Sequence, residues 1–182
     1  MNDYEIREAL CNYIVDTHSD KFRIIDEFVI GKARADIVMV TDFLTGYEIK
    51  GDTDSYTRLP GQIKEYDSYF QRNYFVVGEN HIKSAEKHIP QYWGIIFISK
   101  SENNEQIETI REPKPNPKFN QKKQLRLLWR KELSNLLKCN KLQKCYGKNK
   151  AYIAKYLFEN VQLNILQKQI CEELFERDWT LL

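Results

Sequence analysis

The sequence has few of the features that mark membrane, secreted or ATP-hydrolysing proteins. No apolar run approaches the roughly 20 residues that a membrane helix needs. The first residues, Met1 to Glu5, are acidic and lack the basic and then apolar layout of a secretory signal. The chain has only seven glycines and no glycine-rich phosphate loop. We therefore expect a cytoplasmic protein that neither spans a membrane nor uses ATP.

Cysteine and histidine are also scarce. The four cysteines form no C-x-x-C pair, which favours reduced thiols over the alternatives of a zinc site or a disulfide framework. The three histidines show no metal-ligand spacing with cysteines or acids, and we expect surface or hydrogen-bonded side chains. These residues are Cys11, Cys139, Cys145 and Cys171, and His18, His81 and His88.

Apolar residues and an uneven distribution of charge are what the chain does have. Hydrophobic residues make up 42% of the 182 positions and aromatic residues 13%, enough for a real core. Residues 1–112 hold 13 Lys and Arg against 20 Asp and Glu, whereas residues 113–182 hold 15 against 6. Within residues 114–155 there are 13 basic residues and one acid, Glu132. This pattern suggests an acidic site in one half and an anion-attracting surface in the other.

The periodicity predicts an α/β domain followed by helices. Helical spacing covers residues 3–17 and about 57–71, with a short helix near 84–87. Strand-like runs cover residues 22–30, 33–40, 43–50, 73–78 and 92–99. Residues 101–120 are polar, contain three prolines and resemble a linker. We expect a domain over residues 1–112, a Pro-rich linker over 113–120, and a basic helical extension over 121–182.

Three charged residues stand on strands that should be mostly buried. Asp36 directly precedes an apolar run, and Glu48 and Lys50 end the third strand. Residues at i and i+2 point to the same face of a strand, so Glu48 and Lys50 should project side by side, about 6.6 Å apart along the chain. Buried charges cost free energy unless they are paired or bind a metal. A structural alternative is a surface salt bridge at the strand end.

Phosphodiester cleavage requires these residue types. Two carboxylates on adjacent strands can bind Mg²⁺ or Mn²⁺, which polarises the phosphate and lowers the pKa of a bound water. A lysine can orient that water and stabilise the charge that develops on the phosphate. Asp36, Glu48 and Lys50 therefore form a candidate metal-dependent hydrolytic site.

At these residues the chain resembles the PD-(D/E)XK nuclease superfamily, in which an acid on one strand precedes E-x-K on the next within an α-β-β-β-α-β core. The resemblance covers roughly residues 3–78, with Ala35 where the family name has proline. It implies a restriction endonuclease-like mixed sheet, metal ligation by Asp36 and Glu48, and Lys50 as the catalytic lysine. The chain is also similar to small uncharacterised bacterial nuclease-like proteins.

Two further patterns extend the resemblance. Many members carry an upstream acid that binds metal, and Glu27 is favoured for this role over Glu5 and Glu8 on the first helix. Gln62 and Tyr66 fit the Q-x-x-x-Y pattern of RecB-like and phage lambda exonuclease-like members, and their i, i+4 spacing places them on one helical face. We expect both to position the site.

The basic extension would hold a polyanion against the acidic site, with DNA expected before RNA. The residues expected to bind nucleic acid are Arg58, Lys122, Lys123, Arg126, Arg130 and Lys131. The alternative is that the basic faces only solvate a helical bundle. The sequence thus predicts a nuclease, with two rivals: a catalytically silent nucleic-acid-binding or protein-interaction module, and a structural subunit. The helical tail is a candidate surface for a second copy or a partner protein.

Overall fold

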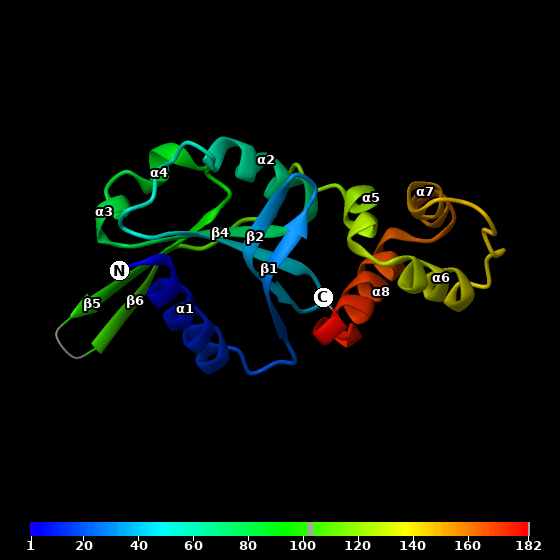
Figure 1. Cartoon of the computed structure of the whole chain (residues 1–182), viewed down its shortest axis with the longest axis horizontal. Helices are drawn as coiled ribbons and strands as arrows, with labels where there is room; N and C mark the ends of the chain where they lie inside the picture. Colours follow the sequence, from blue (N-terminus) through cyan, green and yellow to red (C-terminus); the bar gives the residue numbers. More distant parts are fainter. Residues whose placement is uncertain (102–103, 182) are drawn as a thin grey trace.

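Six strands form one mixed sheet in a computed structural model that describes residues 1–101 and 104–181 (Figure 1). The strands are β1 (Arg23–Ile30), β2 (Ala33–Val40), β3 (Leu44–Lys50), β4 (Arg72–Val77), β5 (Gly94–Ser101) and β6 (Asn104–Arg111). They lie side by side in chain order. Strands β1 to β3 form an antiparallel meander, β3 to β5 are parallel, and β6 pairs antiparallel with β5.

Helices cover both faces of this sheet and extend beyond one side of it (Figure 1). The longer helices are α1 (Asp3–Thr17), α2 (Leu59–Tyr69), α6 (Arg130–Cys139), α7 (Lys150–Asn160) and α8 (Leu163–Glu176). The short ones are α3 (Glu79–Ile82), α4 (Ala85–His88), α5 (Gln121–Gln124), η1 (Leu125–Leu127) and η2 (Trp179–Leu181). The protein is thus a mixed α/β fold with a C-terminal helical region. No helix within the described residues is both long and apolar enough to cross a membrane.

Two apolar clusters explain how the layers are held together. Helix α1 buries Ile6, Leu10 and Ile14 against one face of the sheet, where Tyr47 and Ile49 of β3 meet them. The opposite face packs against α2 through the second apolar cluster. This cluster continues without interruption into the leucines of η1, α6, α7 and α8. Every residue of β3 is buried, because this strand is covered on both faces. Any charged side chain on β3 is therefore withdrawn from water.

The predicted elements agree with the structure except after residue 100. The first helix, the three-strand meander, the second helix and the strands at 73–78 and 92–99 are confirmed within two residues at each end. Before the helical extension, two elements were missed, namely α3 and β6. The prediction that residues 101–120 form a linker is wrong for 104–111, which form β6. This strand is polar because it lies at the sheet edge, where exposed Glu105 and Glu108 need no apolar neighbours.

Residues 112–120 contain no helix or strand, yet they are fixed to the core. The Asn116 side-chain amide donates to the carbonyls of Asp67 and Phe70, at 2.9 and 2.7 Å. The Lys114 backbone N–H donates to the carbonyl of Tyr92 at 2.9 Å. These bonds hold the Pro-rich segment against the end of α2, so it is not a free spacer between the sheet and the helical region.

A pair of glycines offers a test of the packing between α2 and the sheet. A Cβ added at Gly46 of β3 would collide with the Phe70 ring and come within 2.8 Å of Tyr66 Cδ1, whereas one at Gly61 of α2 meets nothing within 4 Å. We expect Gly46→Ala to lower the free energy of unfolding by about 1–3 kcal/mol through overpacking. Gly61→Ala should instead raise it by about 0.5–1 kcal/mol, because alanine favours the helix. Urea denaturation of both variants measures this, and a neutral Gly46→Ala would contradict the packing described.

Candidate active site

The backbone ladder between β2 and β3 ends one residue before the predicted acids. Pairing runs from Val40 opposite Leu44 to Ile37 opposite Tyr47, and beyond it the two strands no longer pair with each other, although β2 still pairs with β1 and β3 with β4. Across this opening the Tyr66 hydroxyl accepts from the Asp36 N–H at 3.1 Å and donates to the Tyr47 carbonyl at 3.0 Å. At this position the Tyr66 side chain of α2 therefore replaces the direct backbone hydrogen bond between β2 and β3. This gap between β2 and β3 brings the Asp36 side chain close to Glu48 and Lys50 of β3.

Glu48 and Lys50 lie on the α2 face of β3, as their spacing predicted. Their side chains are 0% and 4% exposed, and Lys50 Nζ lies 3.4 Å from Glu48 Oε1. The Lys50 ammonium makes no hydrogen bond to Glu48, and among the described residues neither Glu48 oxygen has a hydrogen-bond partner. The pKa of Glu48 is raised to about 8, chiefly by burial and then by the charge of Asp36, while the charge of Lys50 lowers it. A buried carboxylate left unbonded in this way is one that a cation would stabilise.

Asp36 is the more accessible acid, with a side chain 19% exposed. Its Oδ2 accepts from the backbone N–H of Ile49 at 2.8 Å, which ties it to β3 beyond the end of the ladder. Burial raises the pKa of Asp36 to about 6, although the Ile49 N–H and the guanidinium of Arg7 both lower it. The two acids therefore share one site and differ mainly in how far each is removed from water.

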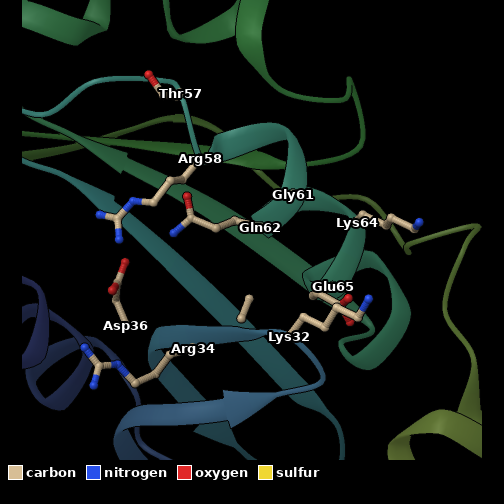
Figure 2. A pocket seen from close by; sticks show the side chains of 10 residues that line it. Lys32, Arg34, Asp36, Thr57, Arg58, Gly61, Gln62, Lys64 and Glu65 are labelled. Carbon is tan, nitrogen blue, oxygen red and sulfur yellow. The ribbon is translucent and has the colours of Figure 1, made fainter.

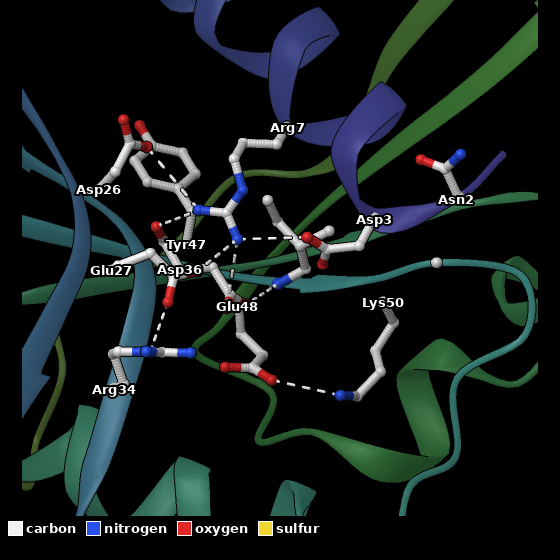
Figure 3. Close-up of polar contacts among 12 residues, drawn as sticks. Asn2, Asp3, Arg7, Asp26, Glu27, Arg34, Asp36, Tyr47, Glu48 and Lys50 are labelled. Carbon is white, nitrogen blue, oxygen red and sulfur yellow. Dashed lines mark hydrogen bonds and ion pairs between the residues drawn. The ribbon is translucent and has the colours of Figure 1, made fainter.

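Arg7 of α1 lies among four carboxylates at the edge of this site (Figure 3). Its Nη2 is 2.9 Å from Glu27 Oε1, 3.2 Å from Asp3 Oδ2 and 3.6 Å from Asp36 Oδ1. Its Nη1 is 3.7 Å from Asp26 Oδ1 and donates to the carbonyl of Asp36. One positive charge thus stands where several negative charges converge. Sequence reasoning missed Arg7; the signal that could have found it is the Asp3-x-x-x-Arg7 spacing beside the buried stripe of α1.

Glu27 lies on β1, opposite Asp36 of the neighbouring strand β2, and its carboxylate does not pack beside that of Glu48. Its backbone adopts the left-handed conformation, with φ of 55°, between the pairs Asp26–Ile37 and Phe28–Ala35. Its carboxylate pairs with Arg7 and with Arg34. Within the described residues no three acidic, histidine or cysteine side chains are grouped to hold a metal. The three-acid set of Glu27, Asp36 and Glu48 is therefore not assembled here.

The two competitors of Glu27 on α1 also lie away from Asp36. Glu5 closes a capping box with Asn2 and pairs with Lys100 at 3.5 Å. Glu8 is exposed on the same helix. The first helix contributes Asp3 and Arg7 to the neighbourhood of Asp36, and neither predicted glutamate.

The left-handed backbone of Glu27 also changes which residues of β1 face α2. Ile25 lies on the α2 side before Glu27, and Phe28 and Ile30 lie on that same side after it. On β2 the switch falls at Asp36, because Ala35 and Val38 belong to one cluster and Ile37 to the other. The alternation of a regular strand would place Ile25 and Phe28 on opposite faces. This paired irregularity marks the site, since left-handed backbone is uncommon for a residue other than glycine.

Beside Asp36 lies a cavity of about 580 Å³ between α2 and the β1–β2 turn (Figure 2). Four cationic side chains line it, against the two acids Asp36 and Glu65. The cations are Lys32, Arg34, Arg58 and Lys64. Such a lining attracts phosphate groups toward Asp36. Glu48 and Lys50 do not line the cavity, because both are buried behind it.

The two α2 residues of the predicted pattern face the site in different ways. Gln62 lines the cavity, and its Oε1 is buried without a hydrogen-bond partner. Tyr66 is fully buried and acts on the backbone of β2 and β3. Arg58, at the start of α2, lies in the same cavity wall. The structure therefore brings Asp36, Arg58 and Gln62 to one cavity and places Glu48, Lys50 and Tyr66 behind it.

The five basic residues predicted on the extension lie outside this cavity. Lys123 donates to the Ser68 hydroxyl at 2.9 Å, and Arg130 donates to the carbonyl of Lys148. Arg126 lines a different cavity, with Lys150 and Arg177. Lys122 is half-buried and Lys131 exposed. None of them lines the cavity beside Asp36.

These features define a mixed α/β protein with a buried acid–lysine site and a basic helical region. The chain belongs to the bacteriophage P4 protein cII family, which matches residues 1–178. It is 28% identical over 116 residues to Protein cII of Enterobacteria phage P4. That match covers 63% of this chain and 44% of the relative, so the chain aligns with less than half of the relative's length.

Two solved structures are distantly similar to the chain. One is a protein of unknown function from Silicibacter pomeroyi, with 13% identity, a TM-score of 0.38, and coverage of 76% of this chain and 70% of that one. The other is Pyrococcus furiosus SfsA in complex with Ca²⁺, with 16% identity, a TM-score of 0.32, and coverage of 62% and 61%. At these scores neither likeness bears on function.

The raised pKa of Glu48 gives a stability prediction with a definite sign. In the unfolded chain the group has its ordinary pKa of 4.5, and in the folded protein its pKa is about 8. Its contribution to stability is therefore fully present below about pH 4.5 and is lost as the pH rises toward 8. Asp36, raised from 3.8 to about 6, acts in the same direction over its own range.

In metal-free protein, we expect the free energy of unfolding to fall between pH 5 and 8, and Glu48→Gln to flatten that fall. Urea denaturation across this range measures it, with Glu8→Gln on the exposed face of α1 as the matched control. Parallel profiles for the parent and Glu48→Gln would contradict the burial of a protonated Glu48.

Proposed function

We propose that the chain is a metal-dependent nuclease of the restriction endonuclease-like, PD-(D/E)XK class, which hydrolyses phosphodiester bonds in DNA before RNA. The observation that carries this is the convergence of Asp36, Glu48 and Lys50 where the β2–β3 ladder opens. The element order from α1 through β1, β2, β3 and α2 to β4 matches the order that the resemblance implies. The cationic cavity beside Asp36 supports a polyanionic substrate.

The residues at the site fit a hard divalent cation. Both oxygens of Glu48 are buried without hydrogen-bond partners, and carboxylate oxygens are the ligands that Mg²⁺ and Mn²⁺ prefer. Mg²⁺ is commonly bound by one or two carboxylates, its remaining ligands being water and substrate phosphate, so Asp36 and Glu48 suffice. When bound, the ion would polarise the scissile phosphate and lower the pKa of a coordinated water.

The chain's own residues would then perform distinct roles. Lys50 holds its ammonium beside Glu48, where it would orient the attacking water and stabilise developing negative charge. Arg58 and Gln62, on the cavity wall, would bind and orient the phosphate backbone. Tyr66 would fix the position of Asp36 through its backbone N–H without touching the substrate.

A second candidate is a nuclease-fold module that binds nucleic acid without cutting it. One observation favours it: Glu48 and Lys50 are shielded from the cavity, and Arg7 already neutralises Asp36. In that case the cationic cavity would hold a phosphate backbone, and the acids would serve only as partners of Arg7 and Lys50.

Cleavage assays separate the two candidates. Linear and circular DNA and RNA would be incubated with the parent protein in Mg²⁺ or Mn²⁺, beside Asp36→Asn and Lys50→Met, which preserve side-chain shape. We expect cleavage by the parent, a loss of roughly 100- to 1,000-fold in Lys50→Met, because a group that stabilises transition-state charge is removed, and a comparable loss in Asp36→Asn.

Lys87→Met, which removes an exposed lysine of α4 outside the lining of the cavity beside Asp36, is the matched control and should retain most activity. Glu27→Gln shows whether the upstream acid takes part. Salt-sensitive binding that is equal in parent and variants, without cleavage by any of them, would support the silent module and contradict the nuclease.

Arg7 should compete with a metal ion for Asp36. Two unit charges about 4 Å apart near a protein surface interact by roughly 4 kcal/mol, so a cation bound at Asp36 must displace or oppose Arg7. We expect Arg7→Gln to tighten Mn²⁺ binding by roughly tenfold, equivalent to about 1.4 kcal/mol. Isothermal titration calorimetry without nucleic acid, at pH 8.5 so that Asp36 is ionised, measures this.

Arg34→Gln is the matched control, because Arg34 pairs with Glu27 and makes no ion pair with Asp36. Unchanged or weaker Mn²⁺ binding in Arg7→Gln would show that the ion does not bind at Asp36.

A further inference from the structure

A second basic cavity, of about 610 Å³, lies on the helical region between α6 and α7. Four cationic side chains line it, namely Arg130, Lys138, Lys141 and Lys144. No carboxylate of residues 1–101 or 104–181 lines it, and its apolar side includes the buried residues Leu137 and Ile153. It shares no lining residue with the cavity beside Asp36.

None of the four cations that line this cavity makes an ion pair with a carboxylate in the part of the chain that the structure describes. The one acid within residues 114–155, Glu132, is buried. The Arg177 guanidinium donates to both Glu132 carboxylate oxygens, at 2.7 and 2.6 Å, and the backbone N–H of Trp129 also donates to Glu132 at 2.6 Å. The one acid of α8 bonded to a lining residue is Glu173, which accepts from Asn135 at 3.2 Å. The cavity thus offers four cations to an anionic partner.

Exposed aromatic rings accompany these cations. Tyr146 lines the cavity and is 79% exposed, with Lys144 Nζ 6.0 Å from its ring centre. On α7, Tyr152 is 46% exposed, with Lys148 Nζ 5.1 Å from its ring centre. An exposed tyrosine ring presents a flat apolar face on which an unstacked base can pack. Cations beside exposed rings suit a strand whose phosphates and unstacked bases are both accessible.

We propose that the cavity between α6 and α7 binds single-stranded nucleic acid, with phosphates on Arg130, Lys138, Lys141 and Lys144 and a base stacked on Tyr146. A duplex fits less well, because its base faces are already stacked inside the helix. The inference goes beyond the proposed nuclease, since this cavity would bind a strand whether or not Asp36 takes part in cutting one.

The test uses the full chain, with EDTA present so that no cleavage occurs. Fluorescence anisotropy would measure binding of a labelled 15-nucleotide oligo-dT, a 15-base-pair duplex, and a polyglutamate peptide. We expect the oligo-dT to bind more tightly than either of the others. Tyr146→Ala should weaken oligo-dT binding roughly 5- to 100-fold, the loss expected for one stacked base, while Tyr146→Phe should restore it. Tyr4→Ala, at a ring 70% exposed on α1, is the matched control.

A charge variant provides an independent readout. Affinity falls as salt rises, and each phosphate contact on a single strand makes the slope of log affinity against log salt steeper by about 0.7. Lys141→Ala combined with Lys144→Ala should therefore reduce the steepness of that slope by about 1.4. The same change at two exposed lysines near α4, Lys83 and Lys87, should leave that slope unchanged.

Three results would each overturn the proposal: binding that Tyr146→Ala leaves intact, a duplex that binds as tightly as the single strand, or a polyglutamate peptide that binds as tightly as oligo-dT. Absence of cleavage in Mg²⁺ would reject the nuclease and leave this binding measurement unaffected.

Discussion

The hydroxyl of Tyr66 bonds to two strands at once, and the arrangement of the site depends on it. Where the β2–β3 ladder ends, this group joins the Asp36 N–H to the Tyr47 carbonyl. Without such a partner, a buried N–H and a buried carbonyl would be left unbonded at the centre of the sheet, which is costly. Because Tyr66 is itself buried against Phe70 and Trp93, α2 holds the opening at a fixed width.

That opening allows charged side chains to exist within a buried sheet. Asp36 turns its carboxylate to the Ile49 N–H, and the Lys50 ammonium lies beside Glu48 on the α2 face. The remaining negative charge is balanced from the opposite side by Arg7. In this state Asp36 is neutralised by a guanidinium, and the raised pKa of Glu48 favours its protonated form near neutral pH. A divalent cation would replace the roles of both Arg7 and that proton.

Much of this could be predicted from the sequence, because the relevant patterns are local. The i, i+2 spacing of Glu48 and Lys50 placed them on one face, and the i, i+4 spacing of Gln62 and Tyr66 placed both toward the site. Glu27 shows where such reasoning stops. Its left-handed backbone reverses the alternation of β1, and no residue type at that position signals it. Arg7 was missed for another reason, since its partner Asp36 is distant in sequence. Strand β6 was missed because it is a polar edge strand without an apolar run.

The proposed chemistry requires that Asp36 and Glu48 together form a cation site. The most direct measurement is a crystal structure of the protein grown or soaked with Mn²⁺, with anomalous scattering used to locate the ion. We expect one ion bonded to oxygens of both Asp36 and Glu48, at about 2.1 Å, with Arg7 withdrawn from Asp36. An Mn²⁺ ion bound elsewhere, or none at a concentration that saturates binding in solution, would contradict it.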